Sequence, residues 1–308
     1  MATHESPRTA RVLAQLVDDV VHTQPCRRIV TRCLECQLER GGPRRIRNRV
    51  SINDVENFMK DEIRNEVGAN VAWVVGVGPV HGAGAAIAKR FAKEGLTVVV
   101  TGRSTERLEQ VVRDIEADGG NAIAMPGDAT KEDEILFVLN RIETIGPLEV
   151  GVYNAGNAKW APTLELSSAL FEEIWRVGCL GGFMFGREVA RVMQRRGSGT
   201  ILFTGATASL RGKPSFTAFA AAKAGLRMVS QSLAREFAPL GIHVAHVVID
   251  GSIHGEKILT VLPELVAKKG PDGLLSVNAI ADTFWHLHQQ HRSAWSHEID
   301  LRPFAEPF

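Results

Sequence analysis

The sequence predicts an α/β protein built on a doubly wound parallel sheet, a single domain preceded by an N-terminal helical and basic extension. Three observations support this fold class. From about residue 70 onward, short apolar runs alternate steadily with helical patterns. A glycine turn joins the first apolar run to the first of these helices. Several apolar runs end in small polar residues, as strands of an open parallel sheet do at their ligand-binding edge.

The first strand is expected at Val71 to Val77, because a strand covered on both faces appears as a continuous apolar run. A helical pattern follows at about 83–95. Further strands are expected at about 97–101, 121–126, 148–153, 199–204 and 242–249, and further helices at about 104–118, 131–145, 168–196 and 216–239. A helix near 278–290 and a strand near 297–301 complete a domain that we take to run from 67 to 308.

Residues 1 to 66 form a separate Arg-rich extension, which we expect to be partly helical or disordered. Positions 1 to 50 hold ten arginines and no lysine. The apolar stripe from Val12 to Val21 and the cap-like pair Ser51 and Asp54 favour two helices. A transit peptide, a basic arm for a partner and an appendage without function all stay open, although two acidic residues at 18 and 19 argue against the first.

The overall composition favours a soluble, cytoplasmic protein. The net charge is only +1, which argues against a nucleic-acid partner for the whole chain. No apolar run approaches the length of a membrane span, and we expect no secretory signal, because the first residues lack a charged start followed by an apolar block. Four cysteines are too few for a disulfide scaffold. Cys26, Cys33 and Cys36 lie near His22, but a second Cys-x-x-Cys is missing, so no metal is expected.

The glycine turn after the first strand predicts a dinucleotide site. Gly78, Gly82 and Gly84 would allow a tight turn, a close approach of backbone N–H groups to a pyrophosphate, and close packing of helix on strand. The phosphates would then lie at a helix N-terminus, where unpaired N–H groups and the helix dipole favour negative charge. His81, within the turn, could add a donor.

The second strand ends in Gly102-Arg103-Ser104, where the adenosine ribose of such a cofactor would lie. An arginine at this place suits a 2′-phosphate, whereas an acidic residue would suit a free 2′-hydroxyl. We therefore expect Arg103 and Ser104 to contact the cofactor, and NADP(H) is favoured over NAD(H). The alternative is that Arg103 is only a solvated residue at the start of a helix.

Polar turns follow the later strands at the same edge of the sheet. Asp128 follows the third strand and could accept from an adenine amino group. Asn154-Ala155-Gly156 follows the fourth strand, Thr204-Gly205-Ala206-Thr207 the fifth, and Asp250-Gly251-Ser252-Ile253 the sixth. Asn154, Ala155, Gly156 and Ile253 are expected to bind the cofactor with Asp128. Ordinary turn chemistry is the alternative for each turn taken singly.

These residues together resemble the short-chain dehydrogenase/reductase family over roughly residues 70 to 308. The resemblance rests on Gly-x-x-x-Gly-x-Gly at 78 to 84, on Asp128, on Asn154-Ala155-Gly156, and on Lys223 in Phe219-Ala-Ala-Ala-Lys223. It implies a Rossmann-like domain, a nicotinamide cofactor, a small-molecule substrate, and a homodimer or homotetramer built on the two long helices.

The family's usual catalytic set of Asn, Ser, Tyr and Lys is largely replaced. Lys223 stands at the lysine position, but Phe219, Ala206 and Gly178 occupy the tyrosine, serine and asparagine positions. A positioned proton donor contributes about 10² to 10⁴ in rate, so the usual alcohol or ketone chemistry is disfavoured. Lys223 could still hold the nicotinamide ribose or act as the acid itself. The alternative is an ordinary surface lysine on a helix.

Weaker candidates lie elsewhere along the chain. Asp250 could act as a general acid or base, and Tyr153 could reach the nicotinamide end, although a buried packing role suits a tyrosine that ends a strand. Residues 252 to 276 are predicted to form a mobile segment over the substrate. The histidines carry weaker metal or structural hypotheses; they are His243, His246, His286, His288, His291 and His297.

Two functions follow from these patterns. The first is an NADP(H)-dependent oxidoreductase with a non-standard acid, which reduces an activated C=C, C=N or C=O bond. The alternative is a non-catalytic NADP(H)-binding protein that serves as a cofactor sensor or an oligomer partner.

Overall fold

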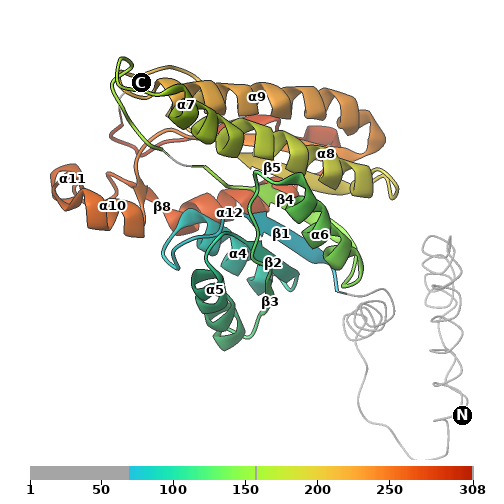
Figure 1. Ribbon diagram of the computed structural model, residues 1–308. Helices are drawn as coiled ribbons and strands as arrows, with labels where there is room; N and C mark the ends of the chain where they lie inside the picture. Colours follow the sequence, from blue (N-terminus) through green and yellow to red (C-terminus); the bar gives the residue numbers. More distant parts are fainter. Residues whose placement is uncertain (1–68, 157, 307–308) are drawn as a thin grey trace, which may run out of the picture. The chain divides into compact units, whose positions relative to one another are not determined.

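The computed structural model describes residues 69–156 and 158–306, and a seven-stranded sheet forms their centre (Figure 1). Every strand pair in it is parallel, and the strand order is β3-β2-β1-β4-β5-β6-β9. The strands are β1 (Val71–Val75), β2 (Thr97–Thr101), β3 (Asn121–Ala124), β4 (Leu148–Tyr153), β5 (Gly199–Thr204), β6 (Ile242–Ile249) and β9 (Glu298–Leu301). The order reverses between β1 and β4, which opens a crevice at the carboxyl edge.

Helices cover both faces of this sheet, as the doubly wound prediction requires. They are α4 (Ala83–Lys93), α5 (Thr105–Ala117), α6 (Glu132–Glu143), α7 (Ser168–Trp175), α8 (Gly181–Met193), α9 (Thr217–Phe237) and α12 (Val277–His288). Successive side chains of a strand point to opposite faces. In β1, Ala72 and Val74 therefore join the core under α4, α5 and α12, while Trp73 and Val75 join the core under α6, α8 and α9. The predicted α/β fold class is confirmed.

The long helix expected at 168–196 is interrupted, so the prediction of one continuous helix is wrong there. A π-helical turn, η1 (Arg176–Leu180), separates α7 from α8. The Tyr153 hydroxyl donates to the carbonyl of Val177 within this turn, at 2.7 Å. Gly178 packs so tightly on α9 that an added Cβ would lie 2.7 Å from the Cβ of Ala222. Isolated π turns occur often at functional sites.

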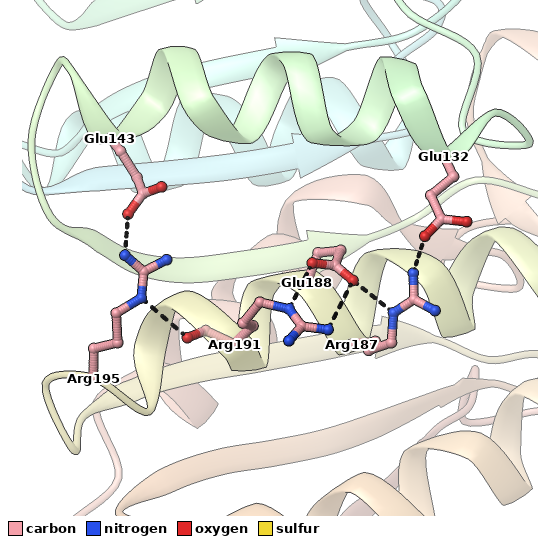
Figure 2. Close-up of polar contacts among 6 residues, drawn as sticks. All are labelled: Glu132, Glu143, Arg187, Glu188, Arg191 and Arg195. Carbon is pink, nitrogen blue, oxygen red and sulfur yellow. Dashed lines mark hydrogen bonds and ion pairs between the residues drawn. The ribbon is translucent and has the colours of Figure 1, made fainter.

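An ion-pair network fastens α8 to α6 (Figure 2). The buried Glu188 accepts from Arg187 Nε at 2.6 Å and from Arg191 Nε at 2.9 Å. Burial by itself would raise the pKa of Glu188, but these two arginines outweigh it and lower that pKa. The remaining pairs join Arg187 to Glu132 and Arg195 to Glu143. The network fixes α8, which continues from the π turn beside the crevice.

Residues 252 to 276 carry short elements that the sequence did not predict. They are β7 (Ile253–His254), α10 (Glu256–Val261), α11 (Pro263–Lys269) and β8 (Leu275–Ser276). β7 and β8 pair in parallel as a separate two-stranded sheet. The mobility of this segment stays a prediction.

The expectations for residues 1 to 66 lie outside the described residues. These expectations include the two helices, the basic character of the extension and the Cys26, Cys33 and Cys36 group. The domain boundary at 67 also stays a prediction. None of the helices in the described ranges is long and apolar enough to cross a membrane.

Candidate functional site

The glycine turn after β1 fits the backbone around it closely. A Cβ added at Gly84, in the first turn of α4, would lie 2.9 Å from both Asn154 Nδ2 and the carbonyl oxygen of Gly76. A Cβ added at Gly78 would meet nothing within 4 Å. Gly84 therefore allows the helix to approach the strand, while Gly78 faces open space beside the helix N-terminus. No side chain caps that terminus at Gly82, so its N–H groups suit an anion.

A cleft of about 500 Å³ lies at the crevice between β1 and β4. Nine of the predicted cofactor residues line it: Gly78, Gly82, Gly84, Arg103, Ser104, Asp128, Asn154, Ala155 and Gly156. Among the described residues that line the cleft, three predicted ones do not appear: His81, Lys223 and Ile253. The structure thus brings the glycine turn after β1, the Asn154 turn after β4 and Arg103 after β2 to one cavity.

The wall formed by β2 and α5 is cationic. Arg103 and Arg107 both line the cleft, and both are exposed. Ser104 is the N-cap of α5, and its hydroxyl accepts the Arg107 N–H at 3.4 Å. Arg176 lines the cleft from the π turn. The sequence reasoning missed Arg107 and Arg176; the place of Arg107 in the first turn after a serine cap was the available signal for it.

Asp128 and Asn154 hold the middle of the cleft. Asp128 Oδ1 accepts the backbone N–H and the hydroxyl of Thr130, at 2.9 and 2.8 Å. Asn154 Nδ2 donates to the carbonyl of Gly76 at 3.0 Å, and its Oδ1 accepts the Thr204 hydroxyl at 3.0 Å. Asn154 therefore ties together the carboxyl ends of β1, β4 and β5, which keeps the cleft in shape.

Neither His81 nor Ile253 is among the described residues that line the cleft. The His81 side chain is exposed, and its carbonyl accepts the Glu256 N–H of α10 at 3.2 Å. Ile253 begins β7, the short strand after β6. Cofactor contact by either residue stays a prediction.

Lys223 is buried on α9, with only 4% of its surface exposed, so its interpretation as a surface lysine is wrong. Its Nζ donates to the carbonyl of Thr204 at 2.7 Å and lies 6.0 Å from the centre of the Phe219 ring. A Cβ added at Gly156 would lie 3.2 Å from this Nζ. Burial lowers the pKa of Lys223 to about 8, which makes its ammonium a better proton donor near neutrality.

The three replaced family positions lie on α9, just after β5 and in the π turn. Phe219 precedes Lys223 by one helical turn on α9, and Ala206 follows β5 just beyond the carbonyl that Lys223 contacts. Gly178 lies against Ala222, where no side chain would fit without a shift. These replacements supply neither the hydroxyls nor the amide of the usual set.

Tyr153 and Asp250 have other engagements. The Tyr153 ring is fully buried, and burial raises the pKa of its hydroxyl, which agrees with the packing role. The buried Asp250 accepts the Thr207 hydroxyl at 2.6 Å and pairs with Arg302 and, at 3.5 Å, with Arg211. These contacts make Asp250 a structural ion-pair partner, and they leave its acid or base role without support.

The candidate histidines are dispersed over separate partners. His243 bonds to the Ser296 carbonyl at 2.8 Å, His288 to the Thr200 hydroxyl at 3.0 Å, and His297 to the Val244 carbonyl at 3.2 Å. Over residues 69–156 and 158–306, no group of three or more His, Cys, Asp or Glu side chains is arranged to hold a metal ion.

Comparison with known proteins identifies a family that shares these features. Residues 70–253 match the family model described as short chain dehydrogenase. A 2-dehydro-3-deoxy-D-gluconate 5-dehydrogenase of Formosa agariphila is 33% identical over 181 residues, which cover 58% of this chain and 68% of that protein.

Two solved structures are also similar. The short-chain dehydrogenase from Rhodopseudomonas palustris is 42% identical, with a TM-score of 0.66 over 76% of this chain and 99% of that one. A metagenomic short-chain oxidoreductase, solved in complex with NADP, is 26% identical, with a TM-score of 0.66 over 78% of this chain and 99% of that one.

Proposed function

Because the chain belongs to the short-chain dehydrogenase family of oxidoreductases, we propose that it is an NADP(H)-dependent member in which Lys223 alone of the usual catalytic set remains. The observation that carries this proposal is the cleft itself. One cavity joins the glycine turn, the cationic end of β2 and the Asn154 turn, and the buried Lys223 lies directly beyond Gly156.

The residues present fit a 2′-phosphorylated dinucleotide. Gly78 leaves open space beside the uncapped N-terminus of α4, which suits a pyrophosphate. Arg103 and Arg107 line the same cleft, and the acidic residue that would select a free 2′-hydroxyl is missing at the end of β2. The related metagenomic oxidoreductase was solved with NADP. These points support NADP(H) over NAD(H).

The chemistry follows from what Lys223 can do without a tyrosine. A bound reduced nicotinamide would supply a hydride to the substrate. The proton that completes the reduction must then come from the protein or from solvent. The Lys223 ammonium is desolvated and can release a proton from Nζ near neutral pH. Such a site suits an activated C=C, C=N or C=O bond, which needs less help than an ordinary ketone.

A second function, cofactor binding without turnover, is favoured by the replacement of three of the four usual catalytic side chains, by Phe219, Ala206 and Gly178. The Lys223 Nζ already donates to the Thr204 carbonyl, and this buried contact would equally hold α9 against β5 in a protein that only senses NADP(H). In the same reading, the chain would act as an oligomer partner.

We also propose a homodimer or homotetramer in the cytoplasm. α8 and α9 carry the partly exposed Phe183 and Met228, at 39% and 49% exposure, and association would cover such side chains. Size measurement in solution tests this assembly.

Reduction assays separate the two functions. Purified full-length protein is mixed with NADPH and with panels of enals, imines, enoyl thioesters and ketones, while the absorbance of NADPH is followed. We expect turnover with an activated substrate, lost in Lys223→Met while NADPH still binds. Lys213→Met, at an exposed lysine before α9, is the matched control and should keep turnover. NADPH binding without turnover on any panel would favour the sensor.

A further inference from the structure

A row of hydrogen-bonded polar side chains lies next to the carboxyl end of β5, outside the residues that line the cleft. Ser209, at the end of the 3-10 turn η2 (Thr207–Ser209), has its Oγ 3.4 Å from His246 Nε2 of β6. His246 Nδ1 lies 3.0 Å from Glu298 Oε2 of β9. The Glu298 carboxylate accepts two bonds from Arg227 of α9, both at 2.7 Å. The His246 ring is fully buried.

The hydrogen bonds in this row have one consistent direction. The bonds from Arg227 lower the pKa of Glu298, so its ionised carboxylate can only accept, and His246 Nδ1 must carry the proton. Burial lowers the pKa of His246 to about 4, so the ring is neutral and its Nε2 is an acceptor. The Ser209 hydroxyl then donates to Nε2, while its oxygen accepts the Ala206 N–H at 3.1 Å.

These bonds fix the backbone that Lys223 touches. The Gly205 N–H donates to the Val247 carbonyl at 2.7 Å, and the carbonyl of the same peptide unit, that of Thr204, accepts from Lys223. The next N–H along, that of Ala206, is the one that Ser209 accepts. Gly205 leaves room for the imidazole, because an added Cβ would lie 2.4 Å from the His246 ring.

We propose that His246 is a positioning residue of the active site. Through its contacts with Ser209 and Glu298, it holds the carboxyl end of β5 in place, so that the Thr204 carbonyl accepts from Lys223. This inference rests on the proposed role of Lys223. The hydroxyl, imidazole and carboxylate follow the order of a nucleophile triad, but Ser209 is only 4% exposed and its oxygen is committed to the backbone. The arrangement therefore orients a peptide carbonyl and carries no nucleophile.

The direct test changes Ser209, because Ser209→Ala breaks the link to the turn and alters no charge. Lysine labelled with ¹³C at Cε is followed by NMR through a pH titration, and the Lys223 signal is identified by its loss in Lys223→Met. We expect the midpoint to fall by roughly half a unit or more, since a misplaced Thr204 carbonyl stabilises the ammonium less. The charged groups that shift the pKa of His246 are Glu298, Lys223 and Arg227, and all three are unchanged in this variant.

Ser230→Ala is the matched control, because Ser230 is a fully buried serine of α9 whose hydroxyl bonds to the carbonyl of Arg227 in its own helix. It should leave the Lys223 midpoint in place. A second variant, Glu298→Leu, removes the acceptor of the His246 Nδ1–H bond and should shift the ¹⁵N signals of His246 away from the Nδ1–H form.

An unchanged Lys223 midpoint in Ser209→Ala would overturn the positioning role. NADPH affinity should stay within about twofold of wild type in Ser209→Ala. Failure of the wild-type protein to bind NADPH would instead overturn the proposed function, and the NMR titration would still decide the positioning role.

Discussion

Two regions of the site differ in how much of the family pattern they keep. The first wall lines the cleft at β1, α4 and β2. The second wall is formed by β4, β5 and α9; its Asn154 turn lines the cleft, whereas Lys223, Phe219 and Ala206 lie outside the described residues that line it. The wall of β1, α4 and β2 has the glycine turn and the arginine at their expected places. The wall of β4, β5 and α9 keeps Lys223 and the Asn154 turn but carries Phe219 and Ala206 where hydroxyls are usual. In the proposed function, cofactor binding and proton transfer therefore depend on separate residues, and a substitution can alter one while the other persists.

The physical origin of this difference lies in what each wall uses. The first wall works through backbone N–H groups and glycines, so close packing preserves it: a Cβ at Gly84 would collide with backbone. In the usual family pattern, the second wall works through the hydroxyls of a tyrosine and a serine. Phe219 and Ala206 can replace these side chains without disturbing the core. Only the lysine there is also held by the fold, through its bond to Thr204.

Restoring the second wall should have the largest effect. The double variant Ala206→Ser with Phe219→Tyr returns both hydroxyls beside Lys223, and we expect NADPH-dependent reduction of simple ketones to rise by about 10² or more. The measurement is NADPH consumption with a ketone panel. Ala206→Ser with Phe216→Tyr is the control, because it places a hydroxyl on the neighbouring ring, whose centre is 6.4 Å from that of Phe219. Equal activity in both double variants would show that the hydroxyl at position 219 makes no specific contribution beside Lys223.

Reversing the charge of Arg103 on the first wall should weaken NADPH binding without affecting Lys223. We expect Arg103→Glu to raise the Kd for NADPH about 100-fold, because it replaces charge-assisted hydrogen bonds with repulsion of the 2′-phosphate. The Kd for NADH should change little. Titration by cofactor fluorescence measures both. Arg113→Glu, an exposed position of α5 that does not line the cleft, is the control. An equal loss for NADPH and NADH would contradict this assignment of Arg103.

Removing the buried amine should stabilise the protein at neutral pH. Lys223 has a pKa lowered from 10.5 to about 8, so its charge opposes folding fully below pH 8, and this cost is relieved as pH rises from 8 to 10.5. At about 1.4 kcal/mol per unit, the gain in Lys223→Met is at most about 3.5 kcal/mol, less about 1 for the lost bond to Thr204.

Denaturant unfolding of Lys223→Met at pH 7 and at pH 10 checks this expectation. The stabilisation should shrink at the higher pH. A variant that is less stable than wild type at pH 7 would show that Lys223 serves the fold of the second wall rather than its chemistry.

A smaller effect should come from Ser104, which lines the first wall and caps α5. Ser104→Ala should lower the free energy of unfolding by about 0.5 to 1 kcal/mol, since an N-cap hydroxyl is lost. Thermal unfolding measures it. If NADPH affinity also falls by more than about tenfold, Ser104 contacts the cofactor directly and is more than a cap.

Much of the fold was predictable, because apolar periodicity alone places the strands. The run from Val71 and the run at 242–249 are buried on both faces, and such runs are visible in sequence. The π turn at Arg176–Leu180 was not predictable, because its contacts, from Val177 to Tyr153 and from Gly178 to Ala222, join positions that are far apart in the sequence. The short helices after β6 also carry too few residues for a periodic signal.

The site divides in the same way. Gly78, Arg103 and Asn154 follow strands directly, so their place at the sheet edge could be inferred from order along the chain. The link from Ser209 through His246 to Glu298 joins three elements that are far apart in sequence, and only the fold brings them together. A lone strand histidine such as His246 is usually structural, and its partners cannot be identified from the sequence.

Calorimetric titration of the folded full-length protein with NADPH and, separately, with NADH shows whether the cleft binds a nicotinamide dinucleotide. The cleft geometry predicts uptake of NADPH with the higher affinity, and a clear loss of that preference in Arg103→Glu. Absence of heat with both nucleotides, from protein shown to be folded by circular dichroism, would contradict the account.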